Sequence, residues 1–489
     1  MVSTSEPIAP RGDQRALKVE TNGIEVISDA ERKGSPPQLF WPWFGANVSV
    51  LGLGYGSFTL GFGVSFWQAL IAGAVGIVLS FLLCGFVALA GKRGSAPTMV
   101  LGRAAFGVRG NGVPAVLSWV LTVGWETALT ILATLATATV FDELGWSSGT
   151  ATKVIALIVV AALTILGGVM GFDLIMRLQA VITVVTGVLT VVYIVLVLDK
   201  IHWSTVSALP SGSAQETFGC FVFVLTGFGL GWVNAAADYS RYLPRRSSSG
   251  GVVWWTTFGG ALAPVVLLLF GLLLAGSSKT LNNAIYNDPI GALATQLKTW
   301  ALVPFLIVAV LGLVGGAVLD IYSSGLALLT AGLRIPRPLA ALVDGIIMVA
   351  GSIYVVFVAK TSFLFEFEGF LITLGVPIAA WCGIFLADLV LRRRDYAEPE
   401  LFDRRGRYGD VRVLPLLTLV VGTVLGWGLV TNTYASWLEW QGYLLSPVRL
   451  GGKSGEWAFA NLGVVVAFAI GFLVTLLASA GSVRRQEAA

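Results

Sequence analysis

Long apolar runs separated by short polar segments dominate this sequence. A helix needs about 20 mostly apolar residues to cross a bilayer. Twelve runs predict membrane-spanning helices, near residues 40–62, 66–90, 114–141, 153–171, 178–198, 218–238, 251–276, 302–331, 339–359, 369–391, 413–431 and 458–480. An even number of spans places both ends of the chain on the same side of the membrane.

Composition and charge agree with a multi-pass membrane protein that is surrounded by lipid. Of the 489 residues, 56% are hydrophobic and 12% are charged, whereas a soluble domain carries about 25% charged residues. Lys and Arg gather in alternate loops, most densely at 392–412, and such loops are cytoplasmic in membrane proteins. We therefore predict a plasma-membrane protein with both termini in the cytoplasm. Basic loops explain the positive net charge without a nucleic-acid partner.

The spans and polar segments divide the chain into five parts. They are a cytosolic and partly disordered tail at 1–38, a ten-helix core at 39–391, a charged cytoplasmic loop at 392–412, two more spans within 413–480, and a cytosolic tail at 481–489.

The first span contains an interruption. Residues 45–56 read GANVSVLGLGYG, and residues 226–234 of the sixth span read TGFGLGWVN. In lipid every backbone polar group needs an internal partner, and in transporters such broken helices bind substrate or ions with the freed groups. Glycines that only allow close helix packing are the alternative. Two interruptions that begin equivalent halves of five spans, each with an amide (Asn47, Asn234), favour broken helices.

Acidic residues inside the spans are candidates for function, because they are costly in a membrane. Asp238, Asp344 and Asp388 lie near the cytoplasmic ends of their spans, where an interfacial ion pair is the simpler interpretation. Glu126 and Asp320 lie deeper. Burial disfavours the charged form of a carboxyl group, so either could take up a proton on one side and release it on the other. A purely structural hydrogen bond is the alternative.

Aromatic residues at mid-span could hold a planar ligand. Trp125 in the third span, with Phe228 or Trp232 in the sixth, could enclose a flat heterocycle between ring faces. Packing, or a place in an interfacial aromatic belt, is the alternative for each ring.

Other chemistry finds little support in the sequence. Cys84, Cys220 and Cys382 lie in apolar runs, as packing residues do, and the single histidine, His202, lies in a polar loop. A metal site, a histidine relay, a phosphate-binding loop and a cofactor are therefore not expected. A membrane enzyme would need converging catalytic groups, and a channel usually uses repeated filters. We predict a transporter and not an enzyme.

Several motifs, in this order and at these span ends, carry a family resemblance. They are LFW at 39–41, WFGAN at 43–47, GRAAFGVRG at 102–110, VGW at 123–125, ADYSRYLP at 237–244, IYSSGL at 321–326, AD at 387–388 and RRRDY at 392–396. The chain resembles the nucleobase:cation symporter family, in its purine–cytosine permease branch. The resemblance implies an all-helical LeuT-like fold with two inverted halves of five helices, broken helices 1 and 6, and two more helices. It also implies alternating access and cation-driven uptake of a heterocycle.

The resemblance also implies positions for a substrate site. The stacking tryptophan of the family matches Trp125, and the amide one turn later falls on Leu129, which cannot form the hydrogen bond. Glu126 is a candidate to replace it, although it points about 100° round the helix from Trp125. The polar residue of the first break matches Ser49.

In the sixth span the family aromatic matches Phe228 or Trp232, and Gly227, directly before Phe228, is a further candidate for substrate binding. Asp320 is favoured at the position of a family asparagine in the eighth span.

The cation site is where the chain departs from sodium-coupled members. Those members use carbonyls of the first span, here Gly45 and Val48, together with carbonyls and hydroxyls of the eighth. Residues 310–319 contain no Ser or Thr. We therefore expect proton symport, with Asp320 or Glu126 as carrier, of cytosine or a purine by a monomer. Sodium coupling, or another heterocycle such as allantoin, a hydantoin, thiamine or pyridoxine, is the alternative.

Overall fold

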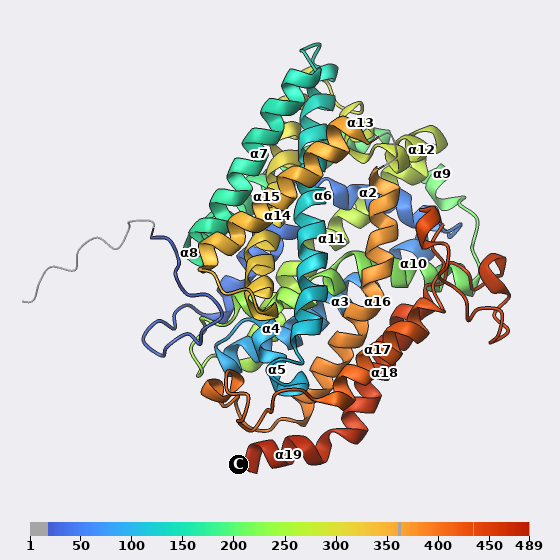
Figure 1. Cartoon of the computed structure of the whole chain (residues 1–489). Coiled ribbons are helices and arrows are strands. Elements are labelled where there is room, and N and C mark those ends of the chain that lie inside the picture. Colours follow the sequence, from blue (N-terminus) through green and yellow to red (C-terminus); the bar gives the residue numbers. More distant parts are fainter. Residues whose placement is uncertain (1–17, 360–362, 434, 489) are drawn as a thin grey trace, which may run out of the picture.

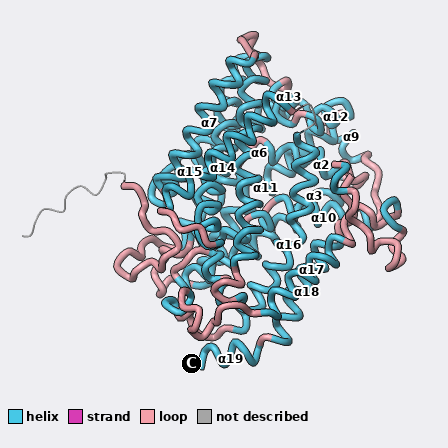
Figure 2. The backbone as a smooth tube through the Cα atoms, in the orientation of Figure 1, coloured by secondary structure: helices cyan, strands magenta, loops and turns pink. Residues whose placement is uncertain are grey.

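The chain folds into one bundle of long helices (Figure 1). The computed structural model describes residues 18–359, 363–433 and 435–488. Within these ranges the chain consists of helices and connecting loops, without a strand (Figure 2).

Nine helical segments of the described residues are long and apolar enough to cross a membrane. They are α3 (Phe66–Gly94), α6 (Gly112–Glu143), α7 (Thr150–Met170), α8 with η2 (Phe172–Lys200), α10 to η4 (Ala214–Tyr239), α11 (Ser249–Ser277), α14 (Thr299–Ala331), α15 with η5 (Arg337–Val358) and α16, counted here from Glu366 to Leu391. Each corresponds to one predicted span.

The three remaining predicted spans correspond to shorter helices. The first consists of α1 (Phe40–Asn47) and α2 (Leu51–Leu60), and the eleventh is α17 (Val413–Trp427). The twelfth is α18 (Leu462–Ala478), which bends by 56° into α19 (Ala480–Ala488). By length and composition, nine described helices qualify, or ten with this bent pair, so the count of twelve crossings stays a prediction.

Short helices complete the fold. They are η1 (Pro36–Leu39), α4 (Thr98–Leu101), α5 (Arg103–Phe106), α9 (Trp203–Ser207), η3 (Gly229–Gly231), η4 (Val233–Tyr239), α12 (Lys279–Asn287), α13 (Pro289–Ala294), η6 (Glu398–Leu401), η7 (Ser436–Leu438) and η8 (Gly452–Ser454). Within the long segments, α8 ends at Val197, α10 at Gly227 and α15 at Ile353, and α16 begins at Phe363.

The two predicted halves of five spans pack against each other in matching pairs. Helix α3 lies along α11, α6 along α14, and α7 along α15. These are the second, third and fourth spans of each half. The broken first spans pack between these helices: α1 contacts α8, α11 and α14, and η3 and η4 of the sixth span contact α3.

The first break lies between Asn47 and Leu51. Val48 leaves the helical conformation, with φ −85° and ψ 79°. The side chain of Ser49 accepts a hydrogen bond from the backbone N–H of Leu51 (3.3 Å), which satisfies one free donor at the start of α2.

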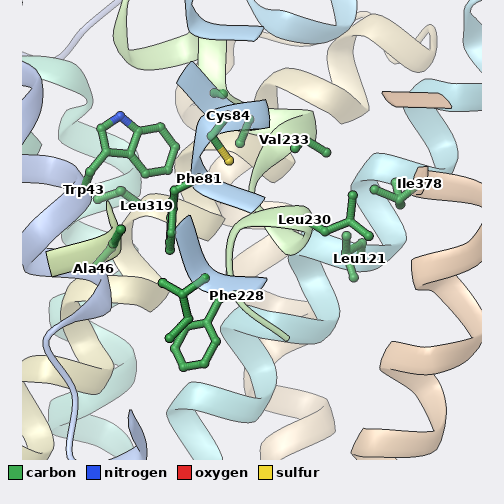
Figure 3. Close-up of a cluster of buried hydrophobic side chains, with 14 of the residues drawn as sticks. Trp43, Ala46, Phe81, Cys84, Leu121, Phe228, Leu230, Val233, Leu319 and Ile378 are labelled. Atoms are coloured by element: carbon green, nitrogen blue, oxygen red, sulfur yellow. The ribbon is translucent and has the colours of Figure 1, made fainter. Parts of the chain in front are cut away.

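The second break begins at Phe228, where φ is −108° and ψ −110°. The neighbouring helix α3 satisfies the freed backbone groups. Gly229 N–H donates to Ser80 Oγ (3.0 Å), and Cys84 Sγ donates to the Gly229 carbonyl (2.9 Å). A Cβ on Gly229 would lie 2.4 Å from the Ser80 backbone, so only glycine fits this close approach. Figure 3 shows Phe228 and Cys84 in one buried cluster.

Basic loops gather on one face of the bundle, which we call the basic face; it comprises residues 18–39, 92–111, 240–248, 332–337 and 392–412 together with α19. Bonds between these segments hold it together. Arg392 forms the predicted ion pair with Asp388 (Nε–Oδ2 2.6 Å) and also donates to Gln486 of α19 (2.7 Å). Asp238 differs from the prediction, because its Oδ1 accepts from the backbone and hydroxyl of Thr98 (2.7 and 2.8 Å) instead of pairing with a cation.

Glu20 fastens the segment before the first span to the basic face. Its Oε1 lies 3.0 Å from Arg241 Nη2 and 3.1 Å from the Tyr322 hydroxyl, and its Oε2 accepts from the backbone of Phe172 (2.8 Å). The Arg241 side chain is fully buried. Burial lowers the pKa of Arg241, but Tyr322, Tyr242, Glu20 and other acidic neighbours outweigh burial and raise it. The buried guanidinium therefore keeps its charge and depends on Glu20 as its partner.

Candidate functional site

A cavity lies between the two breaks and is closed by α6 and α14. Five of the predicted site residues line it: Ser49, Trp125, Gly227, Phe228 and Trp232. The breaks come together here because Tyr55 of α2 packs against the sixth span. Its ring centroid lies 4.4 Å from that of Phe228, and its hydroxyl lies 3.5 Å from the Gly227 carbonyl.

Four aromatic residues line the cavity: Tyr55, Trp125, Phe228 and Trp232. Trp125 meets Phe367 of α16 edge to face, with centroids 5.0 Å apart. Trp232 meets Trp43 of α1 in the same way at 5.9 Å. Phe228 is buried, whereas Trp125 and Trp232 are partly exposed. Both alternatives for the sixth-span aromatic, Phe228 and Trp232, line the cavity.

Polar groups of the wall come from the first break. The Asn47 amide Nδ2 donates to the Trp43 carbonyl (2.8 Å), which leaves its Oδ1 as an acceptor for a ligand. The Ser49 hydroxyl can still donate its proton, because its oxygen is the acceptor in the bond with Leu51. Asn234 does not line the cavity and instead donates to Ser118 Oγ on α6 (2.8 Å).

Sequence reasoning missed several residues of the wall. Tyr55, Leu51 and Gly52 come from α2, and Gly312 comes from α14. Their spacing could have identified the three α2 residues, because positions 51, 52 and 55 share one helix face directly after the break. Leu129 lines the cavity as the resemblance implied, so this part of the wall is apolar.

The carbonyls of Gly45 and Val48 face glycines of α14. A Cβ on Gly315 would lie 2.8 Å from the Gly45 oxygen, and one on Gly312 would lie 2.6 Å from the Val48 oxygen. Gln179 of α8 donates its amide to the Gly315 carbonyl (2.7 Å). The α14 positions opposite these two carbonyls are glycines and therefore supply no side-chain oxygen to a cation between these helices.

The two deep carboxylates lie outside the cavity lining. Glu126 and Asp320 are buried, with 0% and 1% of their surface exposed. Glu126 follows Trp125 on α6 and points toward α14 and α15, where Ser324 contacts it (3.1 Å). Among the described residues, neither carboxylate oxygen of Asp320 has a hydrogen-bond partner. The structure thus separates the aromatic cavity from the acidic groups.

Comparison with known proteins gives three kinds of match. The family model described as "Permease for cytosine/purines, uracil, thiamine, allantoin" matches residues 26–443. A putative purine-cytosine permease, YxlA of Bacillus subtilis (strain 168), is 24% identical over 421 residues, which cover 84% of this chain and 88% of that protein.

Solved structures share the fold. Mhp1, a nucleobase-cation-symport-1 family transporter, in a closed conformation with bromovinylhydantoin bound, aligns with a TM-score of 0.68 at 18% identity, covering 96% of this chain and 100% of that one. Its inward-facing conformation gives 0.64 at 18% identity, covering 95% of each chain. A Na⁺-coupled sialic acid symporter gives 0.62 at 11% identity, covering 94% and 93%. This likeness confirms the predicted all-helical, LeuT-like fold with broken first and sixth spans.

Proposed function

Because the chain belongs to the family of permeases for cytosine/purines, uracil, thiamine and allantoin, and is thus a multi-pass nucleobase–cation symporter and not an enzyme, we propose that it imports cytosine or a purine in symport with a proton. It does so across the plasma membrane by alternating access, with both termini in the cytoplasm.

The observation that carries this proposal is the aromatic cavity between the two breaks. A nucleobase is flat, and its ring can lie between Trp125 and either Phe228 or Trp232, where stacking stabilises it. Its polar edge can form hydrogen bonds with the Ser49 hydroxyl, with the side-chain oxygen Oδ1 of Asn47 and with the backbone near Gly227. Broken helices supply such backbone groups at transporter binding sites. One chain supplies the whole cavity, so a monomer suffices.

Proton coupling rests on the glycines of α14. Sodium is held by hard oxygen ligands, and the α14 residues opposite the Gly45 and Val48 carbonyls are Gly315 and Gly312. Buried carboxyl groups that can bind a proton lie on the same helices as the cavity wall: Glu126 on α6 and Asp320 on α14.

Sodium coupling remains the second candidate because of one observation. Gln179 Oε1 is buried and has no hydrogen-bond donor among the described residues, and a Cβ on Gly45 would lie 2.2 Å from it. This oxygen and the nearby carbonyls could hold a cation without any hydroxyl.

Two measurements on the purified full-length protein test the proposal. The first is thermal unfolding with cytosine, purines, hydantoins and vitamins, since a ligand at a hundred times its Kd stabilises by about 2.7 kcal/mol. The second is uptake of the stabilising compound into proteoliposomes under imposed gradients. We expect a nucleobase to stabilise the protein and its uptake to follow a pH gradient without sodium. Stabilisation by hydantoins or vitamins alone, or uptake that follows only sodium at fixed pH, would refute the corresponding part.

A further inference from the structure

A pair of carboxyl groups joined by one hydroxyl lies beside the cavity, between α6, α14 and α15. Ser324 Oγ on α14 lies 3.1 Å from Glu126 Oε2 on α6 and 2.8 Å from Asp344 Oδ2 on α15. All three residues have 0% of their surface exposed. Asp344 Oδ1 also accepts from the indole N–H of Trp119 (2.8 Å). We call Glu126, Ser324 and Asp344 the carboxyl pair site.

The number of available protons decides which contacts of Ser324 can be hydrogen bonds. The Ser324 hydroxyl has one proton, and both of its close carboxylate neighbours are acceptors when ionised. The Ile321 carbonyl, 3.2 Å from Ser324 Oγ, is a third and more distant acceptor for the same proton. If Ser324 donates to Asp344, then Glu126 Oε2 forms a hydrogen bond to Ser324 only when it carries a proton itself. With both carboxylates ionised, one contact would be oxygen against oxygen with no proton between them.

The surrounding charges favour the same state. The charged groups that act on Glu126 are Asp344 and Asp320, both acidic. The other charged residues on the helices packed against α6 and α15 are Lys153 on α7, Arg337 on α15, and Glu366, Glu368 and Asp388 on α16, of which Asp388 pairs with Arg392. Asp142 and Glu143 end α6 itself.

None of these residues supplies a positive charge to the pair. Lys153 lies in the first turn of α7, and Asp142 and Glu143 close α6 more than four turns beyond Glu126. Arg337 lies two turns before Asp344 and donates to the carbonyls of Gly168 and Val169 (both 2.6 Å). Two carboxyl groups that share a buried site without a cation do not both ionise, because like charges repel and burial penalises charge.

We propose that Glu126 and Asp344 share one proton through Ser324 and that this carboxyl pair site, not Asp320, binds the proton that drives transport. The proposal rests on proton symport as the proposed function. The proton belongs to the pair and not to either residue alone. A shift moves the Glu126 proton to Ser324 Oγ while the Ser324 proton moves to Asp344 Oδ2. The hydroxyl is regenerated, and the negative charge passes from Asp344 to Glu126.

The position of the site on α6 links it to the substrate. Trp119 and Glu126 are seven residues apart and therefore share a helix face, which is turned to the pair, whereas Trp125 lines the cavity. Ser324 lies on α14, which also borders the cavity at Gly312. A change in the packing of α6 on α14 would therefore alter both the cavity and the distance across the pair.

The test compares exchange with accumulation in proteoliposomes, using the nucleobase that stabilises the wild-type protein. Exchange at equal pH needs no net proton movement. Accumulation under a pH gradient, with the membrane potential held at zero, should reach about tenfold per pH unit for one proton per substrate. We expect Glu126→Gln and Asp344→Asn to retain exchange, which shows that they fold, but to lose accumulation. Ser324→Ala should slow proton entry measured with an internal pH dye, and Ser324→Thr should restore it.

Two further variants sharpen the result. Asp142→Asn changes an exposed carboxylate at the end of the same helix α6 and is the matched control, which should still accumulate substrate. Asp320→Asn removes the other candidate proton carrier and discriminates between the two assignments, because the pair site requires that this variant still accumulates substrate. Wild-type accumulation in Glu126→Gln and Asp344→Asn, or its loss in Asp320→Asn alone, would overturn the proposal while proton symport stands.

An infrared measurement separates failure of this proposal from failure of the proposed function. A carboxyl group that holds a proton has its own C=O stretching band, which the Glu126→Gln, Asp344→Asn double variant should lose relative to wild type. If wild-type accumulation ignores the pH gradient, proton symport is wrong, and this band still reports whether the pair holds a proton. Absence of a difference band would overturn the pair site itself.

Discussion

Removal of the Glu20 carboxylate should open the basic face. Glu20→Ala leaves the Arg241 guanidinium fully buried without its counter-charge, and it removes an acceptor from the Tyr322 hydroxyl and from the backbone of Phe172. Breaking a buried ion pair by removing one partner costs about 3–5 kcal/mol. The protein can avoid this cost only if the segment around residue 20 leaves and water reaches Arg241.

The expected size of the effect follows from that cost. Since about 1.4 kcal/mol is tenfold, the population of the open form should rise on the order of a hundred- to a thousandfold. Glu20→Gln keeps an acceptor oxygen and loses only the charge. The difference between a charged and a neutral hydrogen bond is about 1–1.5 kcal/mol, so this variant should show roughly a tenfold rise.

Cysteine labelling in nanodiscs measures the opening. Leu326 is buried one turn from Tyr322 on the same face of α14, so Leu326→Cys becomes accessible when the segment leaves. The three native cysteines are buried and give little background. A water-soluble maleimide should label Leu326→Cys faster in the order parent, Glu20→Gln, Glu20→Ala.

Glu25→Ala is the matched control. Glu25 is an exposed carboxylate in the same segment, and its Oε2 accepts from the Gly23 backbone (2.7 Å). Its removal should leave the labelling rate at the parent level. An unchanged rate in Glu20→Ala, or an equal rise in Glu25→Ala, would refute the account of Glu20 as the fastening residue.

Three further predictions concern the cavity and the packing. Trp125→Ala should weaken substrate binding roughly tenfold or more, since stacking adds about 0.5–1.5 kcal/mol beyond buried area. Trp125→Phe should recover part of the lost affinity in a binding titration. An unchanged Kd in Trp125→Ala would contradict the placement of the substrate against this ring. Gly56→Ala should lower the melting temperature, because its Cβ would lie 2.1 Å from the α11 backbone and overpacking costs about 1–3 kcal/mol. Gly250→Ala, with open space around it, should melt like wild type. Arg392→Leu should lower the free energy of unfolding by about 3–5 kcal/mol, because it leaves the buried Asp388 carboxylate without its partner. The double variant Arg392→Leu, Asp388→Leu should melt close to wild type, since replacing a whole buried ion pair by apolar residues is often neutral. Equal melting temperatures of the single and double variants would contradict this.

Local patterns in the sequence predicted the breaks and the main ring of the cavity. Glycines at mid-span indicated the positions of both breaks, and the structure places them at Val48–Val50 and at Phe228–Trp232. The mid-span position of Trp125 and its neighbour Glu126 predicted it as a site residue. The long apolar runs predicted the helices themselves, because lipid leaves the backbone no other way to satisfy its polar groups.

Contacts between distant segments could not be predicted in this way. The place of Asp344 at the start of its span predicts an interfacial residue, yet it meets Glu126 through Ser324 because α15 packs against α6. Asp238 lies three residues before Arg241, but the cation pairs with Glu20, more than two hundred residues earlier. Spacing along one helix predicts which residues share a face; it does not predict which helix lies opposite.

The shortness of α1 and α2 has a consequence for biosynthesis. Their 8 and 10 residues span only about 12 and 15 Å, whereas the hydrocarbon core is about 30 Å thick. Both pack mainly on helices made much later: α1 on α8, α11 and α14, and α2 on α11. These two helices are therefore made early but reach their final place only after α11 has been made, and until then the freed backbone at 48–50 must be sheltered by the insertion machinery or by water.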